Sequence, residues 1–556
     1  ALFEEAVTTP TINVVGGDHA DEDSTVTFNK AVTSSSGITL NDQTGDAKVI
    51  FAANNSVDIT GTIDGASSDE GTIQVTGATK TFASAIGGSQ ALTLIDIDNT
   101  STFNEAISAT NINVADSITA TFKANTTFTT TTLGSSSVFY VGTAATPASI
   151  VINGSIVGAS DGVGTVQVTN SGGNGTLFLG GKLGTSSNSL ALLDVDATTI
   201  LQGDNANVTD DDSDGVYQLN IADITTIDIA ASTELEIKYS VVTSTIDLNG
   251  SSTLTVQSSP QLYNSSFAEV DTDNGFYGGT TTTTSIQGNI TNSGDSNTLT
   301  VWSPLYQAVA QPTTFAGTVN VDTINISKQN YGGYAIFTGS GGVTAGSVIV
   351  TGGNHADEDN LGVFNYSLTT STIVLNKDTG DATIEFTGNN TSTITGTING
   401  SNATEGILKV TGSGKTFSDA VGTTRSLTLI DIDESTTFSG SVDATAINNA
   451  ASKTATFSDN VTATITNSGT LLFNATDAKS VTGTIAEAAG GDTTEIKVIN
   501  SANGEAPSVV TFTGTVAADT LTIGTTTHGG AALFEEAVTT PTINVVGGDH
   551  ADEDST

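Results

Sequence analysis

The most specific chemical signal in the chain is an acidic turn of alternating aspartates. The pattern D-x-D-x-D-G is formed by Asp210, Asp212, Asp214 and Gly215. Ca²⁺ takes roughly six to eight oxygen ligands, and alternate carboxylates in a tight turn supply three of them. The twelfth position of this loop is Ile221 instead of Glu, so a complete EF-hand loop is absent. A shorter relative contains Asp271 and Asp273. These turns are predicted either to bind Ca²⁺ or to be solvated acidic loops.

A second acidic turn, with the sequence HADED, occurs three times. Its copies contribute His19, Asp21, Glu22 and Asp23, then His355, Asp357, Glu358 and Asp359, and finally His550, Asp552, Glu553 and Asp554. Three of the four His residues of the chain lie in this motif. Imidazole and carboxylate groups together can bind a divalent cation, which predicts a metal site. The alternative is a polar loop that ends a strand and protects a sheet edge.

Paired carboxylates form a third pattern. The pairs are Asp96 with Asp98, Asp194 with Asp196, and Asp431 with Asp433. Residues two apart in a strand share one face, so each pair repels unless it is solvated or bridged by a cation. Glycosidases also use two carboxylates, but three similar copies favour a structural or cation-binding role. Nucleophilic triads, phosphate loops and zinc spacings are absent from the sequence. The chain is therefore predicted not to be an enzyme, with a polysaccharide-active β-helix enzyme as a remote alternative.

The composition limits the partners. The 556 residues carry a formal charge of −45 and a single Arg, Arg425. Nucleic-acid binding needs clustered Lys and Arg, so nucleic acid is excluded as a partner. No apolar run reaches the ~18 residues of a membrane span, so no membrane insertion is expected in this segment. The chain has no Cys, which excludes disulfides and thiolate metal sites.

A short repeat must position these acidic groups. Each copy contains a Phe followed four residues later by Val or Ile, as in Phe3/Val7, Phe82/Ile86 and Phe417/Val421. We call this pattern the Phe mark. A turn and a β-branched run follow, and neighbouring marks are often 19 to 25 residues apart. Strands of this length, with turns between them, predict one coil of a parallel β-solenoid per repeat. Tandem Ig-like β-sandwiches are the alternative, because longer echoes recur after 93 and 87 residues.

The sequence also contains two longer repeats, each of which includes several copies of the short one. LTLIDIDNTSTF from Leu92 matches LTLIDIDESTTF from Leu427, an offset of 335 residues. Residues 1–25 recur without a change as residues 532–556, an offset of 531 residues. We interpret the chain as one 531-residue unit followed by the start of the next. We expect residues 532–556 to occupy on one unit the place that residues 1–25 occupy on the next.

The repeats divide the chain into four segments. Residues 1–215 and 311–531 are predicted to be solenoid repeats, and 532–556 is the start of the next unit. Residues 216–310 lack the Phe mark and are predicted to be a divergent β segment or an insertion. They contain five of the nine Tyr residues and the only Trp, Trp302. These aromatic side chains form either a binding face or the core of that segment.

The pattern TFxxxVxxxTIxV, with Thr, Gly and Asn in the turns, resembles bacterial giant surface proteins built from β-strand repeats. It is similar in style to acidic S-layer proteins and secreted repeat adhesins. The resemblance covers most of the chain outside residues 216–310. It implies secretion, a place at the cell surface or in a matrix, and order that depends on Ca²⁺.

These observations together predict a structural extracellular protein. Tandem units would form a fibre, sheath or surface layer, with other copies of the chain as end-to-end or lateral partners. The alternative function is an adhesin that binds glycan, or another surface, through residues 216–310.

Overall fold

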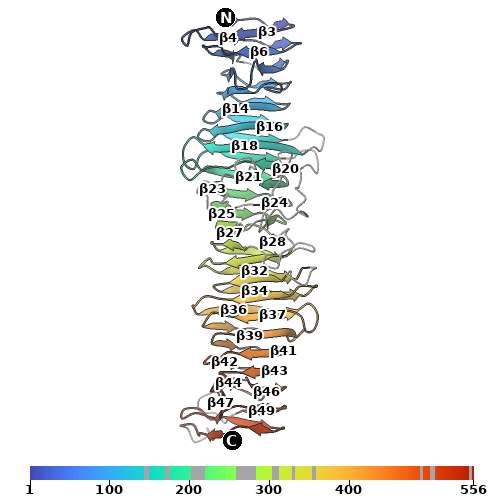
Figure 1. Ribbon diagram of the computed structural model, residues 1–556, viewed down its shortest axis with the longest axis vertical. Coiled ribbons are helices and arrows are strands. Elements are labelled where there is room, and N and C mark those ends of the chain that lie inside the picture. Colours follow the sequence, from blue (N-terminus) through green and yellow to red (C-terminus); the bar gives the residue numbers. More distant parts are fainter. Residues whose placement is uncertain are drawn as a thin grey trace. The chain divides into compact units, whose positions relative to one another are not determined.

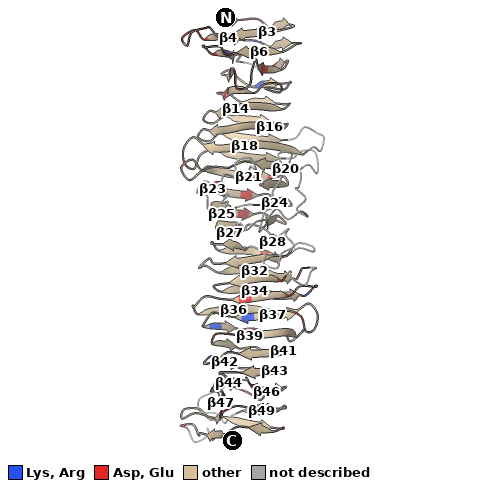
Figure 2. Ribbon diagram, in the orientation of Figure 1, with Lys and Arg blue, Asp and Glu red and all other residues tan. Residues whose placement is uncertain are grey.

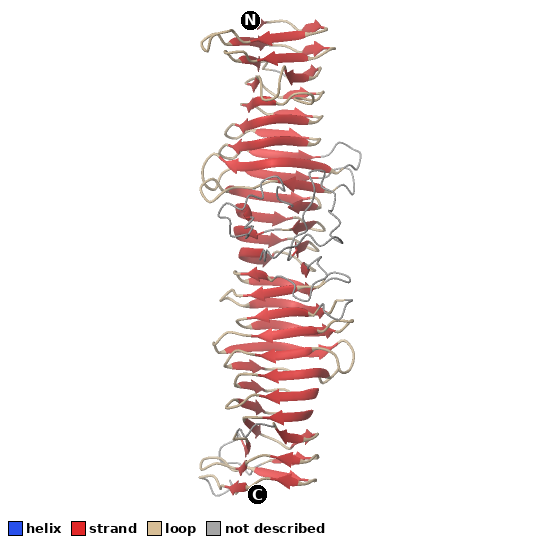
Figure 3. Cartoon of the chain, viewed as in Figure 1, coloured by secondary structure: helices blue, strands red, loops and turns tan. Residues whose placement is uncertain are grey.

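The computed structural model describes the chain except for residue 55 and residues 143–148, 170–175, 202–219, 239, 258–283, 303–311, 328–331, 354–358, 489–492, 501–507 and 550–553. The described residues form two compact units, Ala1–Asn297 (unit 1) and Thr298–Thr556 (unit 2). Both units consist of β-strands and connecting loops, and the described part of the chain contains no helix (Figure 3). It therefore offers no helix with the length and apolar character needed to span a membrane.

The strands of unit 1 are short and follow one another along the chain. They are β1 (Leu2–Phe3), β2 (Val7–Thr9), β3 (Ile12–Val15), β4 (Ser24–Phe28), β5 (Val32–Ser34), β6 (Ile38–Asn41), β7 (Ala47–Phe51), β8 (Val57–Thr60), β9 (Ile63–Gly65), β10 (Thr72–Val75), β11 (Lys80–Phe82), β12 (Leu92–Ile97), β13 (Ser101–Phe103), β14 (Ile107–Val114), β15 (Thr119–Phe122), β16 (Thr126–Leu133), β17 (Val138–Gly142), β18 (Ile150–Gly158), β19 (Thr165–Thr169), β20 (Leu177–Gly180), β21 (Leu190–Asp196), β22 (Thr199–Leu201), β23 (Asn220–Ile229), β24 (Glu234–Ile237), β25 (Ser240–Leu248), β26 (Thr253–Gln257) and β27 (Thr284–Asn292).

Unit 2 is built in the same way. Its strands are β28 (Thr298–Trp302), β29 (Thr313–Phe315), β30 (Val319–Ile326), β31 (Tyr334–Phe337), β32 (Val343–Thr351), β33 (Asn360–Phe364), β34 (Leu368–Asn376), β35 (Ala382–Phe386), β36 (Ser392–Gly400), β37 (Ile407–Val410), β38 (Lys415–Phe417), β39 (Leu427–Ile432), β40 (Thr436–Phe438), β41 (Val442–Asn449), β42 (Thr454–Phe457), β43 (Val461–Asn467), β44 (Thr470–Ala475), β45 (Lys479–Thr482), β46 (Ile485–Glu487), β47 (Glu495–Asn500), β48 (Val509–Phe512), β49 (Val516–Ala517), β50 (Thr520–Ile523), β51 (Ala531–Phe534), β52 (Val538–Thr539) and β53 (Thr542–Val545).

Within each unit the chain winds into coils that stack through parallel strand pairs, as a β-solenoid does (Figure 1). The first coil carries β1, β2 and β3, and these pair with β4, β5 and β6 of the second coil. Paired residues reveal the coil length: Phe3 pairs with Phe28, and Phe103 pairs with Phe122. The predicted parallel β-solenoid is therefore confirmed, and the first coils have close to the predicted length.

Alternation of side chains along each strand produces the core. In β7, Ala47, Val49 and Phe51 are buried, whereas Lys48 and Ile50 between them are only half-buried. β-Branched and aromatic residues suit such a pleated surface, since every second side chain points inward and packs on the coils above and below. The alternation of apolar and polar residues in the sequence therefore places one row of side chains in the core and the other row on the outer surface.

Phe side chains form a stacked column inside each unit. In unit 1 the column runs through Phe3, Phe28, Phe51, Phe82, Phe103, Phe122 and Phe139, with neighbouring ring centroids 4.2 to 5.9 Å apart. In unit 2 it runs through Phe315, Phe337, Phe364, Phe386, Phe417, Phe438, Phe457, Phe473, Phe512 and Phe534. The Phe mark in the sequence is therefore the visible sign of this column.

The column moves from one face to the next at defined steps. Phe51 and Phe82 meet edge to face, as do Phe386 and Phe417. A glycine lies between the two rings in the sequence in each case, Gly61 and Gly396, at the start of the repeated GTI segments. Gly61 has a φ of 116°, and a Cβ there would lie 2.2 Å from the Ser34 carbonyl oxygen. The sharp corner at this step therefore requires glycine.

The segment 216–310 contributes to both units. Its described strands β23 and β25 pair in parallel with each other, and β23 pairs with β21 before it. The division between the units falls between Asn297 and Thr298, so β28 belongs to unit 2. All five Tyr residues of the segment lie outside the described residues. Trp302 is a half-buried residue at the end of β28.

Truncation of one Phe in the column tests the role of stacking. Phe438 is fully buried and lies between Phe417 and Phe457, with ring centroids 4.9 and 5.4 Å away. We expect Phe438→Ala to reduce the free energy of unfolding around β40 by about 3–5 kcal/mol, because it removes the stacking on both rings and leaves a cavity. Hydrogen exchange of β38, β40 and β42 measures this reduction.

The control is Thr437→Ala, which changes the half-buried, outward side chain beside Phe438. Its effect should stay within about 0.5 kcal/mol. Equal effects of the two substitutions would contradict a stabilising Phe column.

Candidate functional site

The turn before β4 is held by its own backbone and by the second coil. The Gly17 N–H donates to the Glu22 carbonyl (2.7 Å), and the Glu22 N–H donates to the His19 carbonyl (3.0 Å). The Gly17 carbonyl accepts hydrogen bonds from the Thr44 and Gly45 N–H groups of the next coil (3.1 and 2.9 Å). The sequence GGDHADED therefore forms a closed loop that projects from the stack.

This loop gathers Asp18, His19 and Glu22. One ligand atom from each residue lies within 4.8 Å of the other two, and all three side chains are exposed. The His19 Nε2 atom is 3.8 Å from the Asp18 Oδ1 atom. Two carboxylates can give oxygen ligands to Ca²⁺, while the imidazole suits Zn²⁺ better. The arrangement could supply up to three ligands, and the rest of a coordination shell would be water.

The predicted metal ligands are thus arranged differently from the pattern HADED. His19 joins Asp18 and Glu22, and Asp21 lies outside this group. The Asp23 carboxylate accepts a hydrogen bond from the Asp46 N–H (3.0 Å), so it fastens one coil to the next. Asp18 stands just before the motif, and the sequence pattern alone did not indicate it because the turn geometry decides which carboxylates approach His19.

The second copy of the motif repeats the fastening role. The Asp359 carboxylate accepts a hydrogen bond from the Asp381 N–H (2.8 Å), and the Gly353 carbonyl accepts from Thr379 and Gly380. Lys377 forms an ion pair with Asp381 (2.6 Å), which raises the pKa of the Lys377 ammonium. His355 and Asp357 lie outside the described residues, as do Asp210, Asp212, Asp214, Asp271 and Asp273.

A file of carboxylates, which we call the aspartate file, runs along unit 1 and comprises Asp194, Asp228 and Asp247. Asp194 pairs in register with Asp228, and Asp228 pairs with Asp247. Neighbouring strands are about 4.8 Å apart, so three like charges lie directly above one another. All three side chains are half-buried, and the acidic segments of β23 and β25 are red in Figure 2.

Polar side chains donate hydrogen bonds to each carboxylate of the aspartate file. Gln167 donates to Asp194 (2.9 Å), Asn249 donates to Asp228, and the hydroxyl groups of Thr291 and Ser293 donate to Asp247 (2.9 and 2.6 Å). Burial, followed by repulsion from Asp196 and Asp228, raises the pKa of Asp194. These hydrogen bonds orient the carboxylates and offset part of their repulsion.

The other aspartate pairs lie on outward faces as expected. Burial and the neighbouring Asp98 raise the pKa of Asp96, while the Lys48 ammonium opposes this shift. Burial and the neighbouring Asp433 likewise raise the pKa of Asp431. The Gln74 side chain donates to Asp98 (2.6 Å). The carboxylates of these pairs therefore face solvent or accept hydrogen bonds from amide groups, and lysine ammonium groups lie among their neighbours.

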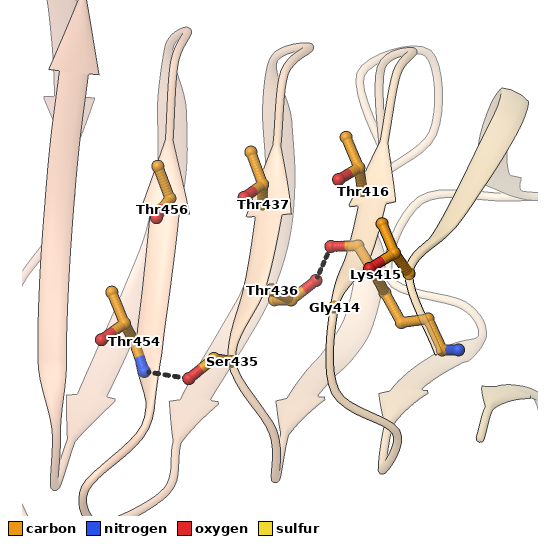
Figure 4. Close-up of a pocket in the computed structure, with 9 residues that line it drawn as sticks. Gly414, Lys415, Thr416, Ser435, Thr436, Thr437, Thr454 and Thr456 are labelled. Carbon is orange, nitrogen blue, oxygen red and sulfur yellow. Dashed lines mark hydrogen bonds between the residues drawn. The ribbon is translucent and has the colours of Figure 1, made fainter. Parts of the chain in front are cut away.

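A hydroxyl-lined pocket of about 270 Å³ lies on unit 2 (Figure 4). Thr416, Thr437 and Thr456 pair in register on β38, β40 and β42 and form one row of its wall. Ser435 accepts a hydrogen bond from the Thr454 N–H (3.0 Å). Hydroxyl groups donate and accept hydrogen bonds but are weak nucleophiles without a base, so this surface suits the binding of polar groups.

The same pocket borders a buried lysine. The Lys415 side chain is 1% exposed, and its ammonium donates to the Asn390 backbone and side-chain oxygens (3.2 and 2.8 Å) and to Ser392 (3.3 Å). Burial lowers the pKa of Lys415. Lys80 occupies the equivalent place in unit 1 and donates to the Ala53 carbonyl (2.5 Å). Both residues stand in the sequence KTF, which was the available signal for this core position.

Comparisons with known proteins give no further guide to this chain, because no protein-family model, no curated protein and no solved structure matches it.

Removing one charge from the aspartate file should stabilise unit 1. Like charges directly opposite each other destabilise a sheet, so we expect Asp194→Asn to raise the free energy of unfolding by roughly 0.2–1 kcal/mol at pH 7. The pKa of Asp194 is raised in the folded chain, so the folded chain binds this proton more tightly than the unfolded chain does. The wild-type chain therefore gains stability as the pH falls toward the ordinary Asp pKa, and the difference from the variant shrinks.

Urea unfolding at pH 7 and pH 5, followed by circular dichroism, measures this difference. Glu105→Gln is the control, because Glu105 is an exposed loop residue. A variant that is less stable than wild type at pH 7 would show that the Gln167 hydrogen bond outweighs the repulsion.

Proposed function

We propose that this chain is a structural extracellular protein that forms a fibre, sheath or surface layer from stacked 531-residue units. The observation that carries the proposal is the equivalence of the two terminal coils. Residues 1–25 form a coil with β1, β2 and β3, and the described part of the identical stretch 532–556 forms a coil with β51, β52 and β53. The first is covered by the coil that follows it, and the second by the coil that precedes it.

The solenoid construction supports a mechanical role. Each coil pairs only with its two neighbours, so every added coil repeats the same backbone hydrogen bonds and apolar contacts. The stability of such a stack grows with the number of coils, and its length has no natural limit. In this role the chain has no catalytic function and lies at the cell surface or outside the cell.

Doubling the unit tests the proposal. A chain of residues 1–531 followed directly by residues 1–556 should fold with the same circular dichroism signal per residue as the single chain. Electron microscopy should show both proteins assembling into filaments or ordered layers. Monodisperse particles of either protein, at every concentration and cation content tested, would refute an assembly function.

We further propose that divalent cations order the projecting loops. The support is the charge of −45 and the grouping of Asp18, His19 and Glu22 on an exposed loop. Cation binding to the folded chain alone raises stability by RT ln(1 + [L]/Kd), about 2.7 kcal/mol at a hundredfold excess over Kd. Thermal unfolding with saturating Ca²⁺, and then with chelator, should therefore show a higher midpoint in Ca²⁺.

The double substitution Asp18→Asn with Glu22→Gln should remove part of that shift, because it removes both carboxylates that lie beside His19. The control is Asp58→Asn with Glu105→Gln, which removes two exposed charges elsewhere in unit 1. Identical midpoints with Ca²⁺ and with chelator would rule out cation-dependent order.

A further inference from the structure

Lys415 is a buried amine that the proposed structural role does not use. It opens β38, its side chain is 1% exposed, and it pairs in register with Ser392 of β36. Among the described residues no carboxylate forms an ion pair with Lys415, and burial lowers its pKa. A buried charge without an opposite charge is costly, so burial favours the neutral amine. A desolvated lysine of this kind offers a lone pair and can act as a nucleophile.

The side-chain amide of Asn390 is the group that this amine meets. The Lys415 Nζ atom lies 2.8 Å from the Asn390 Oδ1 atom. The amide carbon is one carbonyl bond, about 1.2 Å, from that oxygen, so it lies within about 4 Å of the amine nitrogen. Reacting atoms typically start about 3–3.5 Å apart, and the terminal torsion of an Asn side chain is soft enough to close the difference. The amine and the amide carbon are therefore within reach of each other.

Two further hydrogen bonds prepare the Asn390 amide for attack. The Ser392 hydroxyl, which is 5% exposed, donates to Asn390 Oδ1. This donor polarises the carbonyl group and stabilises negative charge that develops on its oxygen. The Asn390 Nδ2 group donates to the Asn365 carbonyl (2.9 Å), which keeps the amide beside the amine. Asn390 itself is half-buried, so a small leaving molecule has a path to solvent.

We propose that Lys415 and Asn390 join in an isopeptide bond, in which the Lys415 amine replaces the amide nitrogen of Asn390 and ammonia is released. The lone pair of Nζ attacks the amide carbon, and the π electrons of the C=O bond move to Oδ1. One proton passes from Nζ to Nδ2, which are both bonded to the same carbon at that stage. The Cγ–Nδ2 bond then breaks and the C=O bond forms again. One amine and one primary amide become one secondary amide and one ammonia, so no further reactant is needed.

This bond links two neighbouring coils. Asn390 precedes β36, and Lys415 opens the strand of the next coil that pairs with β36. The fold holds the two groups together, which replaces a bimolecular encounter by an intramolecular one. The reaction is needed only once in the life of each chain, so a slow rate is sufficient. The link resists separation of the coils and so extends the proposed structural role, but its chemistry does not depend on that role.

The position of Lys415 sets it apart from lysines on the surface. Lys377 and Lys479 form ion pairs with aspartates (2.6 to 2.9 Å), which raise the pKa of both ammonium groups. A protonated amine has no lone pair for the attack. Lys80 occupies the equivalent place in unit 1, but Asn55, the counterpart of the reacting Asn, lies outside the described residues. The proposal therefore concerns Lys415.

Peptide mapping of the full natural chain tests the proposal without any substitution. Trypsin cuts after Lys and Arg, but it does not cut at a lysine whose amine is part of an amide bond. The denatured chain should therefore yield residues 378–409 linked to residues 410–425, with a mass one ammonia below the sum of the two peptides. Separate peptides 378–409 and 410–415, without the linked product, would overturn the isopeptide bond and leave the structural role intact.

Substitution of the lysine tests which amine reacts. Lys415→Arg should abolish the linked peptide, because the guanidinium group stays protonated. Lys453→Arg is the matched control, because Lys453 forms an ion pair with Glu434 (2.7 Å) on the surface, and this variant should keep the linked peptide. A linked peptide that survives in Lys415→Arg would overturn the assignment of Lys415 as the nucleophile.

The time course of the reaction tests the role of Ser392. Chains purified unfolded in urea from inclusion bodies should lack the link and form it after refolding. We expect Ser392→Ala to form it at least about tenfold more slowly, because the polarising donor is lost. Thr393→Ala, which removes the exposed hydroxyl next in sequence, should react like the natural chain, and circular dichroism checks that both variants fold. A link already present in urea, or equal rates in both variants, would contradict a reaction prepared by the fold.

Discussion

The parallel hydrogen bonding between neighbouring coils is the constraint on which the rest of the structure depends. It fixes a separation of about 4.8 Å between coils, so each side chain lies directly above a counterpart on the next coil. Phe rings can stack at this separation, and the Phe columns of both units follow from it. Carboxylates cannot avoid one another at the same separation, and the aspartate file is the other consequence. One backbone pattern therefore creates both the main stabilising contacts and the main repulsions.

Much of the fold could be predicted from the sequence, because a solenoid is defined by local patterns. The Phe mark, the β-branched runs and the turn residues recur about once per coil, and each stands for a buried strand. The switch of the Phe column between faces was not predictable. GTI segments with similar sequences begin new faces, but the face that a segment reaches is set by its pairing with the coil before it, and coil length varies while that pairing is kept.

The candidate sites were harder to predict from the sequence, because strand pairing decides which side chains meet. Asp194, Asp228 and Asp247 are separated by 34 and 19 residues, an irregular spacing that only the strand register converts into a straight file. Lys80 and Lys415 share the sequence KTF, but a lysine at the start of a strand is not expected to be buried, and both side chains are. The HADED turn was predictable from the sequence, but its geometry was not. Backbone hydrogen bonds turn Asp23 toward Asp46 and bring Asp18 beside His19 and Glu22.

We propose that a stack of parallel coils builds a larger assembly along the stacking direction. X-ray diffraction from an oriented specimen of the assembled protein tests this claim most directly. The account predicts a reflection at about 4.8 Å along the orientation axis, because the strands cross that axis and the coils repeat along it. A reflection at this spacing perpendicular to the axis, or its absence from a well-oriented specimen, would contradict the account.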